Sequence, residues 1–259
     1  MKVLLSQTVF ANVATHHGSP EGFLYGDLDS GGWPKSPRDR VVEILRKCFA
    51  LHINGDQHIP FLIQYGLDDC RDANWTFCTP AISAGYPRWF LPDELNYPVK
   101  QRPSHDLPNT GCYEDVFGNK NYVYAVGNPD KKFAEGNRYK YVHSKSSGFG
   151  TIDFDINDRK IKMNALRFIE NIAANFPGWP HTINQMDNFG KEIYGYLPDV
   201  QTKNENALVK CLDEKGDLVY ILRIKGKTFK PFVFEDGKYT IVIDEGNEQR
   251  ELTDLEPVI

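Results

Sequence analysis

The chain lacks two features that would place it among membrane or nucleic-acid-binding proteins. No apolar stretch approaches the ~18–20 residues that a membrane-spanning helix needs. No long run of lysine and arginine occurs, and the formal net charge is −5, so we expect no membrane span and no nucleic-acid partner. The hydrophobic fraction of 41% and the charged fraction of 25% are ordinary for a globular protein. With 259 residues, the chain suits one large domain or two small ones.

The cysteines also exclude particular classes of site. Five cysteines are scattered along the chain and none forms a C-x-x-C pair, so a zinc ribbon or a thioredoxin-like redox motif is absent. The odd number gives no complete disulfide framework. A Cys70–Cys78 or a Cys78–Cys112 bridge is compatible with the sequence, and the redox compartment therefore stays open.

The N-terminus lacks the unbroken apolar segment of about 7–15 residues that a cleaved signal peptide contains. Residues 1–5 begin in that manner, but polar residues from Ser6 onward interrupt the run. We therefore expect strands over residues 3–5 and 9–14.

A helix is expected after the loop at 31–34, which contains two glycines, a tryptophan and a proline. Ser36 can cap this helix, Pro37 suits its first turn, and Asp39 lies where a capping box needs an acceptor. The expected apolar face, at 3.6-residue spacing, consists of Val41, Ile44, Leu45 and Cys48.

Two short apolar runs after this helix, at 49–54 and 61–65, have the composition of buried strands. A strand, a helix and two further strands in succession are typical of an α/β domain. Residues 66–120 are rich in loop-forming residues, and another strand is expected at 122–126.

The remainder of the chain predicts antiparallel β-structure. Apolar residues alternate on both sides of an Asn157-Asp158 turn, which predicts a hairpin with Ile152, Phe154 and Ile156 on one strand and Ile161, Met163 and Ala165 on the other. Four short apolar runs separated by glycine-containing turns follow, at 208–212, 218–222, 229–234 and 239–243. We therefore expect one domain over 1–202 and a small β-sandwich or meander over 203–259.

The Gly-Asp-Gln-His turn at 55–58 is the first site candidate. It follows a predicted strand, and ligands of α/β proteins gather beyond the carboxyl ends of strands. Asp56 and His58 supply a carboxylate and an imidazole two residues apart, which are standard ligands of Zn, Mn and Fe. An ordinary turn without metal is the alternative.

A second candidate is the pair His16 and His17, which ends another predicted strand and precedes a glycine. Adjacent histidines in such a turn can bind a metal or a phosphate, and the alternative is a turn with one exposed histidine. His52 alternates into a strand, and we expect it in the core.

Several segments occur in a characteristic order around the 55–58 turn. An Asp/Trp/Gly-rich loop at 27–34 comes first, Arg38 and Arg40 then lie near the start of the helix, and a strand leads into the Gly-Asp-x-His turn. In this order the sequence resembles the alkaline-phosphatase-D-like branch of the calcineurin-type metallophosphoesterases. Segments that look like a bacterial subgroup of that branch follow at 68–73, 77–80, 86–89, 176–180 and 187–190.

The resemblance implies a fold, a reaction and a set of site residues. It implies a metallophosphoesterase-like sandwich with flanking helices, which hydrolyses phosphate mono- or diesters. Two divalent or trivalent metal ions (Zn, Mn, Fe or Ca) would hold the phosphoryl oxygens and activate a water. The implied metal ligands are Asp56, His58, His16 and His17. Arg88 would clamp the phosphate, with a solvated loop arginine as the alternative. The resemblance also suggests a periplasmic or secreted protein.

The sequence departs from this family in one important respect. Such enzymes take several metal ligands from early motifs, which include a Gly-Asp loop and an Asn-His or Asp-His loop, and we find no substitute for them in this chain. We therefore expect the chain to be the C-terminal half of such an enzyme. It would be inactive alone, with a missing N-terminal segment of the same protein as its partner. The alternative is a non-catalytic module that contacts a glycan or a protein through the aromatic loops at 75–90 and 176–180.

Overall fold

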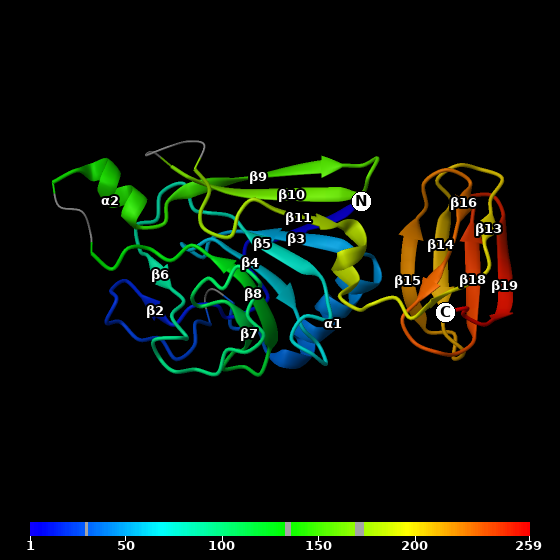
Figure 1. Ribbon diagram of the computed structural model, residues 1–259, viewed down its shortest axis with the longest axis horizontal. Coiled ribbons are helices and arrows are strands. Elements are labelled where there is room, and N and C mark those ends of the chain that lie inside the picture. The colour runs from blue at the N-terminus through cyan, green and yellow to red at the C-terminus, as the bar shows by residue number, and fades with distance from the viewer. Residues whose placement is uncertain (29–30, 133–135, 169–173) are drawn as a thin grey trace.

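A computed structural model describes residues 1–28, 31–132, 136–168 and 174–259 (Figure 1). Asp29 and Ser30, which belong to the loop at 27–34, lie outside the described residues. In the described part no helix is long and apolar enough to cross a membrane.

The largest sheet has six strands in the order β1-β3-β5-β4-β8-β7. β1 is parallel to β3 and β3 to β5, whereas β4, β8 and β7 pair in antiparallel fashion. The strands are β1 (Lys2–Leu5), β3 (Ala50–Asn54), β4 (Phe61–Tyr65), β5 (Trp75–Cys78), β7 (Gly111–Glu114) and β8 (Lys120–Val126). Every residue of β4 and β5 is buried, which places these strands between two layers.

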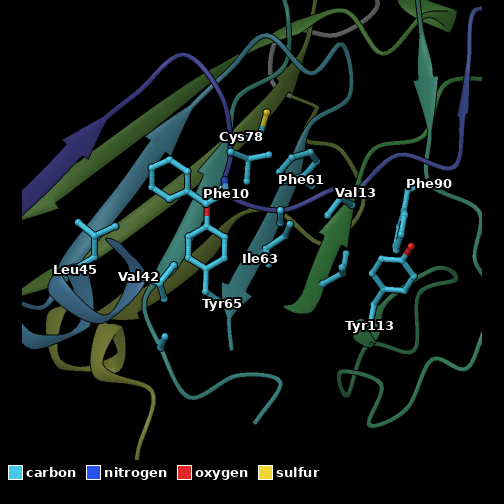
Figure 2. Close-up of a cluster of buried hydrophobic side chains, with 14 of the residues drawn as sticks. Phe10, Val13, Val42, Leu45, Phe61, Ile63, Tyr65, Cys78, Phe90 and Tyr113 are labelled. Atoms are coloured by element: carbon cyan, nitrogen blue, oxygen red, sulfur yellow. Dashed lines mark hydrogen bonds between the residues drawn. The ribbon is translucent and has the colours of Figure 1, made fainter. Parts of the chain in front are cut away.

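The two faces of this sheet pack against different layers. Because successive side chains of a strand point to opposite faces, Phe61, Ile63 and Tyr65 of β4 pack on one side and Leu62 on the other. The first side is covered by the helix α1 (Lys35–Lys47) and the buried segment 9–14, as Figure 2 shows for Phe10, Val13, Val42 and Leu45.

A three-stranded sheet covers the other side, with the order β11-β10-β9. Its strands are β9 (Gly148–Asp155), β10 (Lys160–Arg167) and β11 (His181–Asn184), and the 3-10 helix η1 (Gln185–Phe189) follows. At the end of the molecule away from the C-terminus lie α2 (Arg138–Ser144) and the pair β2 (His16–His17) and β6 (Arg88–Trp89) (Figure 1).

The C-terminal strands form a sheet of their own in the order β15-β14-β18-β19. These are β14 (Leu208–Leu212), β15 (Leu218–Arg223), β18 (Tyr239–Asp244) and β19 (Gln249–Leu255). Two small pairs accompany them: β12 (Gly195–Tyr196) with β17 (Phe232–Val233), and β13 (Val200–Gln201) with β16 (Thr228–Phe229). β12 and β13 precede residue 203 and pair with later strands, so the domain boundary at 203 stays a prediction.

The described chain is therefore mainly β-sheet, with two α-helices. Strands and a helix do alternate near the N-terminus, as the α/β prediction requires. The finer prediction of a sandwich with flanking helices is not supported by the described residues, because α1 is the one long helix and α2 has 7 residues.

The hairpin prediction is confirmed. β9 and β10 pair so that Asp155 lies opposite Lys160, which leaves the turn at 156–159. Ile161, Met163 and Ala165 are buried, as their alternation predicts. On the partner strand the prediction was partly wrong, because Phe154 is 40% exposed and Ile156, which is 71% exposed, lies in the turn after β9.

The helix lies where the sequence predicts it, but its N-cap and part of its buried face differ from the prediction. α1 starts at Lys35 with Pro34 in the N-cap position, so Ser36 does not cap it. Val41, Leu45 and Cys48 pack against the core as predicted. Ile44, however, is 66% exposed, and Arg38 and Val42 are buried in addition.

The prediction of a strand over 9–14 was wrong. These residues are buried coil, and side chains bind their backbone groups in place of a neighbouring strand. The N–H of Phe10 donates to the hydroxyl of Tyr65 at 3.0 Å, and that of Asn12 donates to Asp115 Oδ2 at 3.0 Å.

The disulfide differs from both sequence alternatives. Cys70 is bonded to Cys112, and their Cα atoms are 5.5 Å apart. Cys78 is a free, fully buried thiol on β5, which keeps it out of any bridge.

Candidate functional site

The turn at 55–58 continues directly from the carboxyl end of β3. Asp56 and His58 both have positive φ angles, 57° and 56°, which twist the backbone so that the turn is tight. The N–H of Gly55 donates to the carbonyl of Gln7 at 3.2 Å, which ties the turn to the segment after β1. The turn therefore has a fixed place at the sheet edge.

The two candidate ligands in this turn lie close together. Nε2 of His58 is 3.7 Å from Oδ1 of Asp56, and their side chains are 28% and 53% exposed. Gln7 Nε2 donates to the other carboxylate oxygen of Asp56 at 2.9 Å, which leaves Oδ1 directed toward the imidazole.

The carbonyl of Tyr86 determines the tautomer of His58. Nδ1 of His58 lies 2.5 Å from this carbonyl oxygen. Because a carbonyl can only accept, Nδ1 carries the proton, and in the neutral ring Nε2 keeps its lone pair. A backbone acceptor on the second ring nitrogen is the arrangement that orients metal-ligating histidines. The pair of Asp56 Oδ1 and His58 Nε2 therefore fits two ligand positions of a single metal ion.

The structure places His16 and His17 in different environments. As neighbours on β2 they point to opposite faces. His16 is 8% exposed, its Nδ1 lies 3.0 Å from the hydroxyl of Thr15, and burial lowers its pKa. His17 lies on the side of Tyr86, with ring centroids 5.5 Å apart. The Tyr86 segment thus lies beside both His17 and His58, but His16 belongs to another environment.

Arg88 holds the turn in place. Its Nε donates to Asp27 Oδ2 at 2.9 Å, and Nη1 donates to the carbonyl of Gln57 at 3.4 Å. The side chains of Arg88 and Asp27 are 14% and 10% exposed, so this ion pair is largely buried. The predicted phosphate clamp is therefore already engaged with a carboxylate, and the arginine acts on the turn through Gln57.

Sequence reasoning missed the roles of Asp27 and Tyr86, although both lie in segments that carry the family resemblance. Asp27 begins the Asp/Trp/Gly-rich loop, and Tyr86 begins the segment 86–89. In the structure these two segments and the 55–58 turn meet. The signal was the order of the motifs, but no sequence pattern indicates a contact through a backbone carbonyl.

Two other groups near this end of β3 are inert. Cys78 is fully buried, and burial raises the pKa of its thiol, so it is no nucleophile at neutral pH. The side chain of Gln57 is 1% exposed, and among the described residues its amide nitrogen and oxygen find no hydrogen-bond partner.

A serine and a histidine also meet in the core, but not as a catalytic pair. His52 is fully buried, as predicted, and its Nε2 lies 2.6 Å from the hydroxyl of Ser6. That hydroxyl donates to the carbonyl of Thr8 at 2.6 Å, so Nε2 must donate to Ser6. Burial also lowers the pKa of His52 to about 3. The imidazole therefore cannot take the serine proton near neutral pH.

In the part of the chain that the structure describes, no three His, Cys, Asp or Glu side chains converge as a complete metal site. Comparison of the chain with models of protein families, with curated proteins and with solved structures finds no match. The site is therefore characterised by its geometry: a carboxylate and an oriented imidazole on a tight turn, with a buried ion pair behind it.

Proposed function

We propose that this chain contributes to the metal-dependent hydrolysis of phosphate mono- or diesters, with Asp56 and His58 as two ligands of one metal ion. The observation that carries the proposal is the hydrogen bond from His58 Nδ1 to the carbonyl of Tyr86, which presents Nε2 beside Asp56 Oδ1. When bound, the ion would polarise a phosphoryl oxygen and lower the pKa of a water. The metallophosphoesterase-like sandwich that the sequence resemblance implies is likewise a proposal.

Two ligands do not make a two-metal centre. We propose that full activity needs further donors from a protein segment outside the described residues, and that the chain alone is inactive. The half-exposed carboxylate of Asp56 leaves room for such a segment to approach. His17 is a further candidate from this chain, since its ring lies beside that of Tyr86.

The proposal is tested by phosphate binding in the presence and absence of Zn²⁺. We expect inorganic phosphate to bind when Zn²⁺ is present and not in its absence, and the effect to disappear in His58→Ala. Hydrolysis of p-nitrophenyl phosphate by the chain alone should stay at background. Zinc-independent phosphate binding would contradict the metal role, and robust metal-dependent turnover would contradict the incompleteness of the site.

The alternative, a non-catalytic module that contacts a glycan or a protein through aromatic loops, has less support. The tryptophans of the loops at 75–90 and 176–180 pack inward: Trp75 is 7%, Trp89 0% and Trp179 7% exposed. Tyr86 is 60% exposed, but its ring already lies against His17. Apart from Tyr86, these loops therefore present little open aromatic surface for stacking on a sugar ring.

A further inference from the structure

A cavity of about 430 Å³ lies between the β5/β11 region and the C-terminal strands, and it shares no lining residue with the 55–58 turn. Its volume falls in the range of about 300–1,000 Å³ that is usual for small-molecule sites, which are common where two packed units meet. Nothing in the proposed phosphoesterase function uses it.

Aromatic side chains from both parts of the chain form its apolar walls. Phe232 and Phe234 come from the C-terminal strands, with ring centroids 5.7 Å apart. Trp75 and His181 come from β5 and β11, with ring centroids 5.1 Å apart. Trp75 and Phe232 are 7% and 6% exposed, so these walls offer a narrow apolar contact to a group of the size of an aromatic or branched aliphatic side chain.

His181 behaves as part of the apolar wall. Its ring lies 4.1 Å from that of Tyr124, centroid to centroid. Burial, together with nearby His105, lowers the pKa of His181 to about 4, so the ring is neutral at pH 7. It therefore adds no charge to the cavity.

The lining carries two cationic and two anionic side chains, and within the described part of the chain only Lys191 forms an ion pair. Lys191 is paired with Glu235 at 2.9 Å, and the carboxylate of Asp187 accepts the N–H of Asn184 at 2.8 Å. Lys191 is therefore neutralised within the protein, whereas Asp187 keeps its negative charge.

The other two charges are Arg71 and Glu192. Both are exposed, and neither forms a salt bridge with a residue that the structure describes. The Arg71 guanidinium lies over the ring of Tyr122, 5.2 Å from its centroid, which restricts where it can point. The cavity thus offers the cation Arg71, the more accessible anion Glu192 beside the hydrogen-bonded Asp187, and an aromatic-walled space.

We propose that this cavity binds a free α-amino acid with a large apolar side chain. The carboxylate of the amino acid pairs with Arg71, its ammonium group pairs with Glu192, and its side chain lies against Phe232, Phe234 and Trp75. A guanidinium is well matched to a carboxylate because it can donate two parallel hydrogen bonds. A purely anionic or purely cationic ligand would leave one of the two protein charges unpaired.

The test is isothermal titration calorimetry of the full chain with L-phenylalanine, N-acetyl-L-phenylalanine and phenethylamine. The second compound lacks the ammonium group and the third lacks the carboxylate. We expect L-phenylalanine to bind, and each analogue to bind at least about tenfold more weakly, since each loses one charged contact.

Arg71→Gln and Glu192→Gln should each weaken the binding of L-phenylalanine by about tenfold or more. Because both residues are exposed, we expect both variants to fold, and unchanged melting temperatures will show this. Arg250→Gln and Glu251→Gln, which change exposed residues of β19 outside the cavity, are the matched controls and should bind normally. The proposal is overturned if L-phenylalanine shows no binding up to about 10 mM, if N-acetyl-L-phenylalanine binds equally well, or if Arg71→Gln has no effect.

Discussion

The Arg38 guanidinium shows how single buried polar residues determine this fold. Its side chain is fully buried and donates to five acceptors, which come from separate segments of the chain. They are the carbonyls of Phe10, Gly66 and Lys120, and the side chains of Asp39 and Asn121. The ring of Tyr65 lies beneath it, 5.0 Å away. One side chain thus joins α1, the 9–14 coil, the residue after β4 and the start of β8.

Replacing Arg38 with methionine should therefore destabilise the protein by about 3–5 kcal/mol, since buried carbonyls and a carboxylate lose their donor. The matched control is Arg40→Met on the exposed side of the same helix, which should change the free energy of unfolding by less than about 0.5 kcal/mol. Urea unfolding of both variants measures these changes in the free energy of unfolding. Equal small effects would mean that the hydrogen-bond network of Arg38 is not needed for the fold.

His52 makes stability depend on pH in a predictable direction. Burial lowers the pKa of this histidine to about 3 in the folded state, whereas an unfolded histidine titrates near 6.5. Between these values the unfolded chain binds a proton that the folded chain does not. Above pH 6.5 this residue therefore does not lower the free energy of unfolding. As the pH falls from 6.5 toward 3, the free energy of unfolding decreases by about 1.4 kcal/mol per pH unit because of this residue.

The pH slope is measured from urea unfolding at several pH values between about 4 and 6. In His52→Gln the slope of the free energy of unfolding against pH should correspond to the uptake of about one proton fewer on unfolding. His181, whose pKa burial lowers to about 4, acts in the same direction and should account for part of the slope that remains. An identical slope in His52→Gln would contradict the assignment.

At the level of elements, the disulfide connects two parts of the long region at 66–120. Cys70 and Cys112 are separated by 42 positions, so the bond closes a loop that contains β5, β6 and the start of β7. Chain entropy of the unfolded state predicts a stabilisation of about 4 kcal/mol for a loop of this length.

The double variant Cys70→Ser/Cys112→Ser should unfold at a lower urea concentration than the oxidised protein. Adding a reductant should destabilise the unmodified chain to a similar degree and leave the double variant unchanged. Cys48→Ser, at a free cysteine, is the control. If the reductant shifts the double variant as well, the effect does not come from this bond.

Sequence patterns predicted elements best where one face of an element is buried against a single layer. The β9–β10 hairpin follows its alternation because Met163 and its neighbours face the main sheet. The coil at 9–14 reads as a strand because it is apolar, and its apolar residues are indeed buried. Its backbone, however, binds Tyr65 and Asp115, which are far away in sequence. The face of α1 was misassigned only at Ile44, because a buried arginine does not count as apolar in a periodicity argument.

At the candidate site, too, sequence patterns predict contacts between residues close in sequence and not those between distant segments. The spacing of Asp56 and His58 was enough to predict that their side chains meet. The ion pair of Arg88 with Asp27, 61 positions apart, could not be inferred from composition or periodicity. The Tyr86 contact uses a backbone oxygen, which every residue has, so no residue type indicates it.

At the scale of the whole molecule, the C-terminal sheet shares a core with the rest of the chain. Phe49, which follows α1, is fully buried, with its ring 5.5 Å from Tyr220 and 6.1 Å from Phe232. Phe189 at the end of η1 stacks on Phe234 at 3.6 Å. The two units are thus joined by an aromatic contact, and not by a linker alone.

Phe49→Ala should therefore destabilise the protein by about 3–5 kcal/mol and separate the unfolding of the C-terminal sheet from that of the remainder. Ile44→Ala, at a side chain on α1 that is 66% exposed, is the control and should have a small effect. Thermal unfolding followed by calorimetry distinguishes one transition from two. A single unshifted transition in Phe49→Ala would show that the shared core does not couple the units.

The central claim is that Asp56 and His58 hold a metal ion, and a calorimetric titration with Zn²⁺ at neutral pH tests it most directly. We predict weak binding of a single ion, because the turn supplies two ligands and solvent must supply the others. His58→Ala should weaken this binding by at least about tenfold. His105→Ala is the control, because both ring nitrogens of His105 already have backbone partners. The account is contradicted if Zn²⁺ does not bind, or if it binds His58→Ala as tightly as the unmodified chain.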